Sequence, residues 1–86
     1  MTNISFEGMM AVARQCQDVI RGINQDSEDD MEDAITAGEP LAAIESALDA
    51  AYDHPELSRR FPPQVRLMAE DPDNFELEPY REYLNT

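Results

Sequence analysis

The chain contains few of the residues that build covalent cross-links, metal centres or phosphate sites. Its single cysteine, Cys16, excludes an internal disulfide, and no Cys/His cluster is present that could hold structural zinc. Its three glycines, Gly8, Gly22 and Gly38, lie far apart, which excludes a glycine-rich phosphate loop. Folding must therefore rest on the packing of side chains.

Long apolar runs are also absent. No segment approaches the roughly 20 consecutive apolar residues that a bilayer-spanning helix needs. Residues 1–6 lack the basic stretch and the apolar run of a signal peptide. We therefore expect a cytoplasmic protein with no membrane partner.

The chain offers few candidates for catalysis. His54 is the only histidine, and its position before Pro55 is typical of a turn or capping residue. The nominal nucleophiles, Ser46, Ser58 and Cys16, have no Gly-x-Ser-x-Gly elbow or other activating context. We therefore predict that the chain is not an enzyme and uses no cofactor.

Carboxylates are plentiful, but they do not form a calcium loop. An EF-hand loop needs a glycine at its sixth position, and the stretches that start at Asp26 and at Asp71 lack that glycine. We therefore predict no metal site.

Negative charge dominates the composition of the chain. The chain has 19 acidic residues against 6 arginines and no lysine, which gives a net charge of -13. Such a field repels nucleic acid and anionic membranes and attracts cationic proteins. We therefore expect no direct contact with nucleic acid, and a cationic protein as the partner, such as a nuclease toxin or a nucleic-acid-binding protein. Eleven of the acids lie in the stretch between Arg21 and Arg59, which has no arginine: Asp26, Glu28, Asp29, Asp30, Glu32, Asp33, Glu39, Glu45, Asp49, Asp53 and Glu56.

Apolar residues recur at helical spacing, and no alternating strand pattern is present. With 86 residues the chain makes one domain, 1–86. We predict an all-α fold, a small antiparallel bundle of four to five helices whose first and third members form the core. The C-terminal residues are expected to fray.

The bounds of the expected helices follow from caps and helix breakers. The first helix has Ser5 as its N-cap, and the second has Ser27 as its N-cap and ends before Gly38. The third begins at Pro40 and carries an apolar stripe that reaches Tyr52. Shorter helical segments are expected over 55–61, beyond the proline pair at 62–63, and from near 79.

Acids crowd the second expected helix. Like-charged pairs at i and i+4, such as Asp26/Asp30 and Asp29/Asp33, each cost about 0.2–0.5 kcal/mol. A sequence that bears this cost either binds a partner with the patch or keeps a solvated face that maintains solubility. We take these acids as the candidate partner-binding surface: Asp26, Glu28, Asp29, Asp30, Glu32 and Asp33.

Aromatic and methionine side chains supply further candidates. Tyr80 and Tyr83 lie among glutamates near the C-terminus, and they either anchor a protein interface or pack inward on the domain. We add both tyrosines to the partner-binding residues. The methionines lie at helical spacing and are expected to fill the core rather than to line a groove.

The dipeptide Asp26-Ser27 in a small, acidic, helical chain resembles acyl carrier proteins, in which an Asp-Ser-Leu triplet opens the second helix and receives a phosphopantetheine arm. Here Glu28 stands in place of the leucine. This resemblance implies an alternative function, a carrier modified at Ser27. A third alternative is an assembly protein that self-associates through its apolar stripes.

The stretch from Met31 to Glu45, MEDAITAGEPLAAIE, resembles a pattern in small helical immunity proteins that accompany bacterial polymorphic toxins. In those proteins one helix stops at a Gly-Glu step and an amphipathic helix then begins. The resemblance implies an inhibitor that binds a toxin domain and blocks its active site. A nucleic-acid mimic, whose carboxylates stand in for phosphates, is a close relative of this hypothesis.

Overall fold

The computed structural model describes residues 4–85, and all regular structure within them is helical. This confirms the prediction of an all-α fold. Five α-helices and two short 3₁₀-helices follow one another in the order α1 (Phe6–Val19), α2 (Gln25–Thr36), α3 (Pro40–Ala51), η1 (Pro55–Arg60), α4 (Pro63–Glu70), η2 (Phe75–Tyr80) and α5 (Arg81–Leu84).

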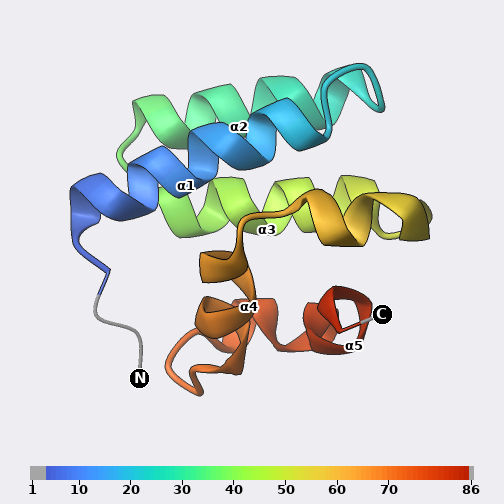
Figure 1. The fold of residues 1–86 in the computed structure, drawn as a ribbon. Coiled ribbons are helices and arrows are strands. Elements are labelled where there is room, and N and C mark those ends of the chain that lie inside the picture. The colour runs from blue at the N-terminus through green and yellow to red at the C-terminus, as the bar shows by residue number, and fades with distance from the viewer. Residues whose placement is uncertain (1–3, 86) are drawn as a thin grey trace.

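Helix α3 is the central element of the molecule. It contacts α1 and α2 on one side and η1 and η2 on the other. The first three helices form one group, and α4, η2 and α5 form a second group beneath them, as Figure 1 shows. The molecule is flat, with extents of 32 × 30 × 17 Å. The finer prediction of a single antiparallel bundle stays a prediction.

The core is built around the alanine-rich stripe of α3. Ala43, Ile44, Ala47, Leu48 and Ala51 are all fully buried. They recur at i, i+1, i+4, i+5 and i+8, so one side of the helix is apolar along its whole length. Each fully buried Ile or Leu contributes about 1.5–3 kcal/mol, and the small alanines let neighbouring helices approach closely.

Two predictions about apolar residues have different outcomes. Met31 and Met68 are buried, and Met9 and Met10 pack partly buried against the core, which confirms that the methionines fill it. Tyr52 was expected on the buried stripe of α3, but it is 54% exposed. The prediction is wrong because Tyr52, which keeps helical dihedral angles (φ -57°, ψ -37°), is turned by about 100° from Ala51 and lies beyond the edge of the buried side of α3.

Both N-caps that the sequence suggested can be compared with the structure. Ser5 caps α1 as predicted, because its Oγ accepts a hydrogen bond from the Gly8 N–H at 3.0 Å. For α2 the prediction is wrong, since the cap is Asn24, whose Oδ1 accepts from the Ser27 N–H at 3.1 Å. Ser27 is the third residue of the helix. Asparagine and serine cap equally well, so the local chemistry favours neither position.

The tight turn between α2 and α3 accounts for the sequence Gly38-Glu39-Pro40. Gly38 has φ +77°, and the N–H groups of Gly38 and Glu39 donate to the carbonyls of Ile35 and Ala34 at 3.0 and 2.8 Å. This is the Schellman pattern, which needs a residue with positive φ after the helix. Pro40 then starts α3 as its first residue, as predicted.

The C-terminal segment packs on the domain, where fraying was expected. Tyr83 and Leu84 are 7% and 2% exposed. Arg66 donates from Nε and Nη2 to the Leu84 carbonyl at 3.2 and 2.6 Å, and Arg81 donates from Nε to the Ala69 carbonyl. Two arginines thus fasten α4 and α5 together through backbone oxygens. Thr86 lies outside the described residues.

The corrected cap can be tested by a pair of matched substitutions. Asn24→Ala should lower the free energy of unfolding by about 0.5–2 kcal/mol, because it removes the acceptor for the Ser27 N–H. Ser27→Ala should leave stability unchanged or raise it slightly, since alanine is the better helix former at an interior position. Urea unfolding followed by circular dichroism measures both. A larger loss in Ser27→Ala than in Asn24→Ala would contradict this cap.

Candidate protein-binding surface

Helix α2 divides its acidic residues between two faces. Its core side carries Met31 and Ile35, which are 0% and 2% exposed. Successive residues of an α-helix are turned by about 100°, which places Glu28 and Glu32 on one flank of that core side. The remaining four acids gather on the opposite, outward face and are all exposed; we call this the aspartate face, Asp26, Asp29, Asp30 and Asp33.

The two glutamates of α2 are engaged with the preceding part of the chain. Glu32 accepts hydrogen bonds from Arg14 Nη1 at 2.9 Å and from Gln17 Nε2 at 3.1 Å. These bonds, first from Gln17 and then from Arg14, lower the pKa of Glu32 below its ordinary value. Glu28 Oε2 accepts from the Gly22 N–H at 3.1 Å. Glu28 and Glu32 were both predicted to bind a partner, but they serve the contact between α1 and α2.

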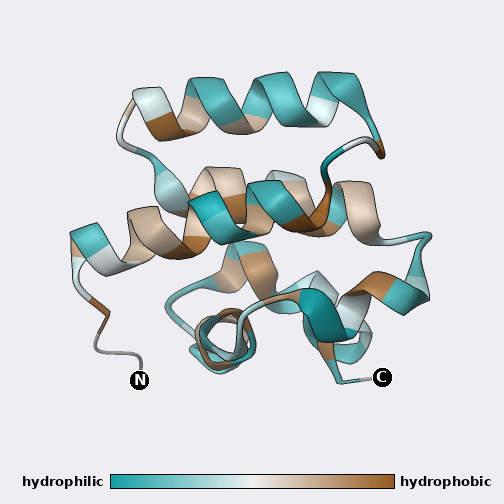
Figure 2. Ribbon diagram, turned by 45° about the horizontal axis from the view of Figure 1, so that its top comes forward, coloured by the Kyte–Doolittle hydropathy of each residue, from teal (hydrophilic) through white to brown (hydrophobic). Residues whose placement is uncertain are grey.

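No arginine of residues 4–85 forms an ion pair with the aspartate face, although Asp29 borders the same surface hollow as Arg14 and Arg21. The side chains of Asp26, Asp30 and Asp33 form no hydrogen bond or ion pair with any other residue in 4–85. Asp29 accepts a hydrogen bond from the neutral amide of Gln25 at 3.0 Å, which leaves its charge in place. Figure 2 shows α2 as a mostly hydrophilic ribbon at the edge of the molecule. Four negative charges therefore face solvent together.

The arginines of the first half of the chain pair with acids outside the aspartate face. Arg14 pairs with Glu32, and Arg21 pairs with Asp18 one helical turn away. The other four arginines all belong to the second half of the chain: Arg59, Arg60, Arg66 and Arg81.

The two tyrosines predicted as anchors lie inward. Tyr83 is 7% exposed, and its hydroxyl donates to the His54 carbonyl at 2.8 Å. Its ring packs between Tyr52 and Phe61, with centroid distances of 6.0 and 6.4 Å. Tyr80 is partly buried. Tyr83 therefore does not present its ring to a partner, and this part of the prediction is wrong because the C-terminal helices dock on α3 and η1.

Tyr52 is the aromatic side chain that sequence reasoning missed. It is 54% exposed, it stacks on Tyr83, and it meets Tyr80 edge to face at a centroid distance of 6.0 Å. An aromatic ring that is held by neighbours and still exposed suits an interface anchor. Tyr52 has the acidic residues Asp49 and Asp53 near it in the chain, just as Tyr80 and Tyr83 have glutamates near them.

The structure places Cys16 in the core and the ring of His54 beside an acid. Burial raises the pKa of the Cys16 thiol to about 12, which makes it a poor nucleophile at neutral pH. His54 Nδ1 lies 3.5 Å from Glu56 Oε2. Over residues 4–85, no group of three or more His, Cys, Asp or Glu side chains is placed to hold a metal ion. The same residues form no helix with the length and apolarity to cross a bilayer.

The structure also places the residues of the two alternative functions. Ser27, the proposed attachment site of a carrier, lies inside α2 and is half-buried. The apolar stripes proposed for self-association are largely used in the core, because the buried residues of α1 and α3 pack in one cluster. The large apolar side chains that stay exposed come from separate elements: Phe6, Ile23, Tyr52, Leu67 and Phe75.

Neutralising opposite ends of the aspartate face should have different effects on stability. Asp33→Asn should stabilise the fold, because it relieves repulsion with Asp29 and Asp30 and removes a negative charge from the last turn of α2. Asp26→Asn makes the same change in the first turn, where it also gives up a favourable interaction with the helix dipole. We expect Asp33→Asn to be the more stable variant by about 0.5–1 kcal/mol in urea at low salt. Equal stabilities would contradict this.

Alkaline titration should report the contact between Tyr80 and α3. Burial, and then the charge of Asp49 3.3 Å from the Tyr80 hydroxyl, raise the pKa of Tyr80 to about 12. An unfolded tyrosine ionises near pH 10, so the fold favours the neutral hydroxyl, and stability should fall as pH rises from about 10 towards 12. Absorbance at 295 nm should show late ionisation of Tyr80 and of Tyr83, whose pKa burial also raises, and Tyr80→Phe should lower the amplitude of that late step. An unchanged late step in Tyr80→Phe would refute the assignment.

Comparison with models of protein families, with curated proteins and with solved structures finds no match to this chain. The function must therefore be argued from the side chains that the fold brings together.

Proposed function

We propose that this chain is a small protein-binding module, built on an antiparallel bundle of helices, that uses the aspartate face of α2 to mask a basic surface of a partner protein. The partner is a cationic protein such as a nuclease toxin or a nucleic-acid-binding protein. The module acts as an inhibitor, either of the immunity type or as a nucleic-acid mimic. The observation that carries the proposal is the set of four uncompensated carboxylates on one exposed helix face.

The spacing of these carboxylates supports the comparison with nucleic acid. Asp26 and Asp33 are seven residues apart, which is about 10 Å along a helix that rises about 1.5 Å per residue. Four charges over that length give one charge per about 3.5 Å. One strand of duplex DNA carries one phosphate per about 3.4 Å of axis. A basic cleft that accepts a phosphate backbone therefore meets a similar linear charge density on α2.

The fold holds this face in place before any partner arrives. Met31 and Ile35 anchor the opposite side of α2 in the core, and Asn24 and the Gly38 turn close its two ends. Rigid charges lose little conformational entropy on binding. At low salt, complementary fields can raise association rates to about 10⁸–10⁹ M⁻¹s⁻¹. In this proposal charge sets the rate of encounter, and an exposed aromatic side chain such as Tyr52 contributes to the lifetime of the complex.

The test compares two variants that have the same net charge. One carries Asp26, Asp29, Asp30 and Asp33 changed to Asn, and the control carries four exposed acids outside α2 changed to their amides. The native chain and both variants are used to capture proteins from the source cell, and the protein that the native chain retains is identified by mass spectrometry. The rate at which that protein associates with each of the three chains is then measured at several salt concentrations. The control substitutions are Glu7→Gln, Glu70→Gln, Asp73→Asn and Glu78→Gln.

We expect the aspartate-face variant to associate about ten-fold or more slowly at low salt, with a flatter salt dependence, while the control stays close to the native rate. The native chain should also block binding or cleavage of nucleic acid by the captured protein. Equal losses in both four-fold variants would mean that net charge, not this face, drives binding. That result would remove the aspartate face from the mechanism.

A further inference from the structure

The arginines of the second half of the chain are placed unusually for so acidic a protein. Acids outnumber arginines 19 to 6, yet Arg59, Arg60, Arg66 and Arg81 form no ion pair with an acid in residues 4–85. Arg66 and Arg81 bind backbone carbonyls instead. Arg59 and Arg60 are exposed and make no hydrogen bond with any described residue. Within residues 4–85, no carboxylate pairs with these two charges.

Two of these arginines border one hollow on the surface. The hollow has a volume of about 370 Å³ and lies where η1 leads into α4. The described residues that line it include no carboxylate, so none of these side chains cancels the positive potential of the arginines. Its lining consists of Ser58, Arg59, Phe61, Pro62, Pro63, Arg66 and Leu84.

Arg66 is held in position with part of its guanidinium group unused. Its Nε and Nη2 donate to the Leu84 carbonyl, and no bond is made by its Nη1 within the described part of the chain. A guanidinium group carries five N–H donors in a rigid plane. Because the carbonyl fixes that plane, the donors that remain at the hollow do not have to be ordered by a ligand.

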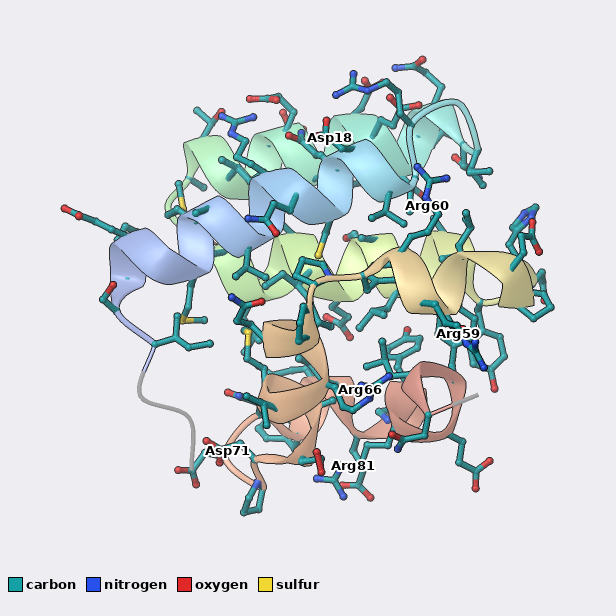
Figure 3. All side chains as sticks on the ribbon, in the orientation of Figure 1. Asp18, Arg59, Arg60, Arg66, Asp71 and Arg81 are labelled. Atoms are coloured by element: carbon teal, nitrogen blue, oxygen red, sulfur yellow. The ribbon has the colours of Figure 1, made fainter. Side chains whose placement is uncertain are left out.

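Arg59 supplies the second charge from the other side of the hollow. Figure 3 shows Arg59 extending from η1 towards α5 and Arg66, whereas its neighbour Arg60 extends the opposite way, towards α1. Arg60 does not line the hollow. Two adjacent arginines in the sequence thus have different surroundings, and only Arg59 can act together with Arg66.

We propose that this hollow is a binding site for an oxyanion, a carboxylate or phosphate group, that Arg59 and Arg66 hold between them. Arginine forks match the oxygens of both groups in geometry and form charge-assisted hydrogen bonds with them. The site is distinct from the aspartate face in position and in sign, and it does not depend on the proposed inhibitor function. A partner that used both surfaces would have to present a basic patch and an acidic group.

The experiment titrates the full ¹⁵N-labelled chain with inorganic phosphate and, separately, with sodium acetate. Sodium chloride at matched ionic strength gives the reference spectrum. We expect saturable shifts in the backbone amides around Arg59 and Arg66 and in their guanidinium N–H groups. Tighter binding of phosphate would identify a phosphorylated ligand, and equal or tighter binding of acetate would identify a carboxylate.

Two neighbouring variants decide whether the hollow is responsible. Arg59→Gln should weaken binding by about ten-fold, because it removes charge-assisted hydrogen bonds. Arg60→Gln makes the same charge change next to it and should stay within about two-fold of the native chain. Urea unfolding checks that both variants keep native stability. The absence of saturable shifts with either anion, or equal weakening in the two variants, would overturn the proposal.

Discussion

The burial of one side of α3 is the interaction on which the rest of the structure depends. Ala43, Ala47 and Ala51 let other helices approach this side closely, while Ile44 and Leu48 fill the space between them. The helix contacts elements from both groups, so it joins the N-terminal three-helix part to the C-terminal part. A short chain with a net charge of -13 gains little from its surface electrostatics, and this apolar packing has to outweigh the repulsion.

The fold divides the acids of α2 between two uses. Glu28 and Glu32 bond to the preceding part of the chain, and the four aspartates turn outward. The net charge is therefore not spread evenly over α2, because the glutamates take part in internal contacts and the aspartates face solvent.

Much of the fold could be predicted from local signals, because caps and breakers act over a few residues. Ser5, Gly38 and Pro40 fixed three helix ends correctly. The prediction of Ser27 as the cap of α2 failed because Asn24, one helical turn earlier, caps equally well. The prediction that Tyr52 is buried failed for another reason, since its direction from the helix axis lies just outside the buried side of α3.

The candidate sites were less predictable because they depend on contacts between distant parts of the chain. Charge counting found the acids of α2 but not that Glu32 would meet Arg14, 18 residues earlier. Alternation of tyrosine and glutamate suggested exposed rings, yet the Tyr83 hydroxyl reaches His54, 29 residues away. The hollow beside Arg59 joins η1, α4 and the end of α5, and no sequence pattern marks it.

The backbone carbonyls bound by Arg66 and Arg81 make these two contacts independent of the protonation of any acid. A peptide oxygen keeps its lone pairs at any pH a protein meets, so the bonds to Leu84 and Ala69 persist when carboxylates take up protons. The Arg14–Glu32 pair behaves otherwise. Because the fold lowers the pKa of Glu32, its contribution is present at neutral pH and is lost as pH falls through that value. Acidification therefore weakens this contact between α1 and α2, while the two arginine–carbonyl contacts keep their acceptors.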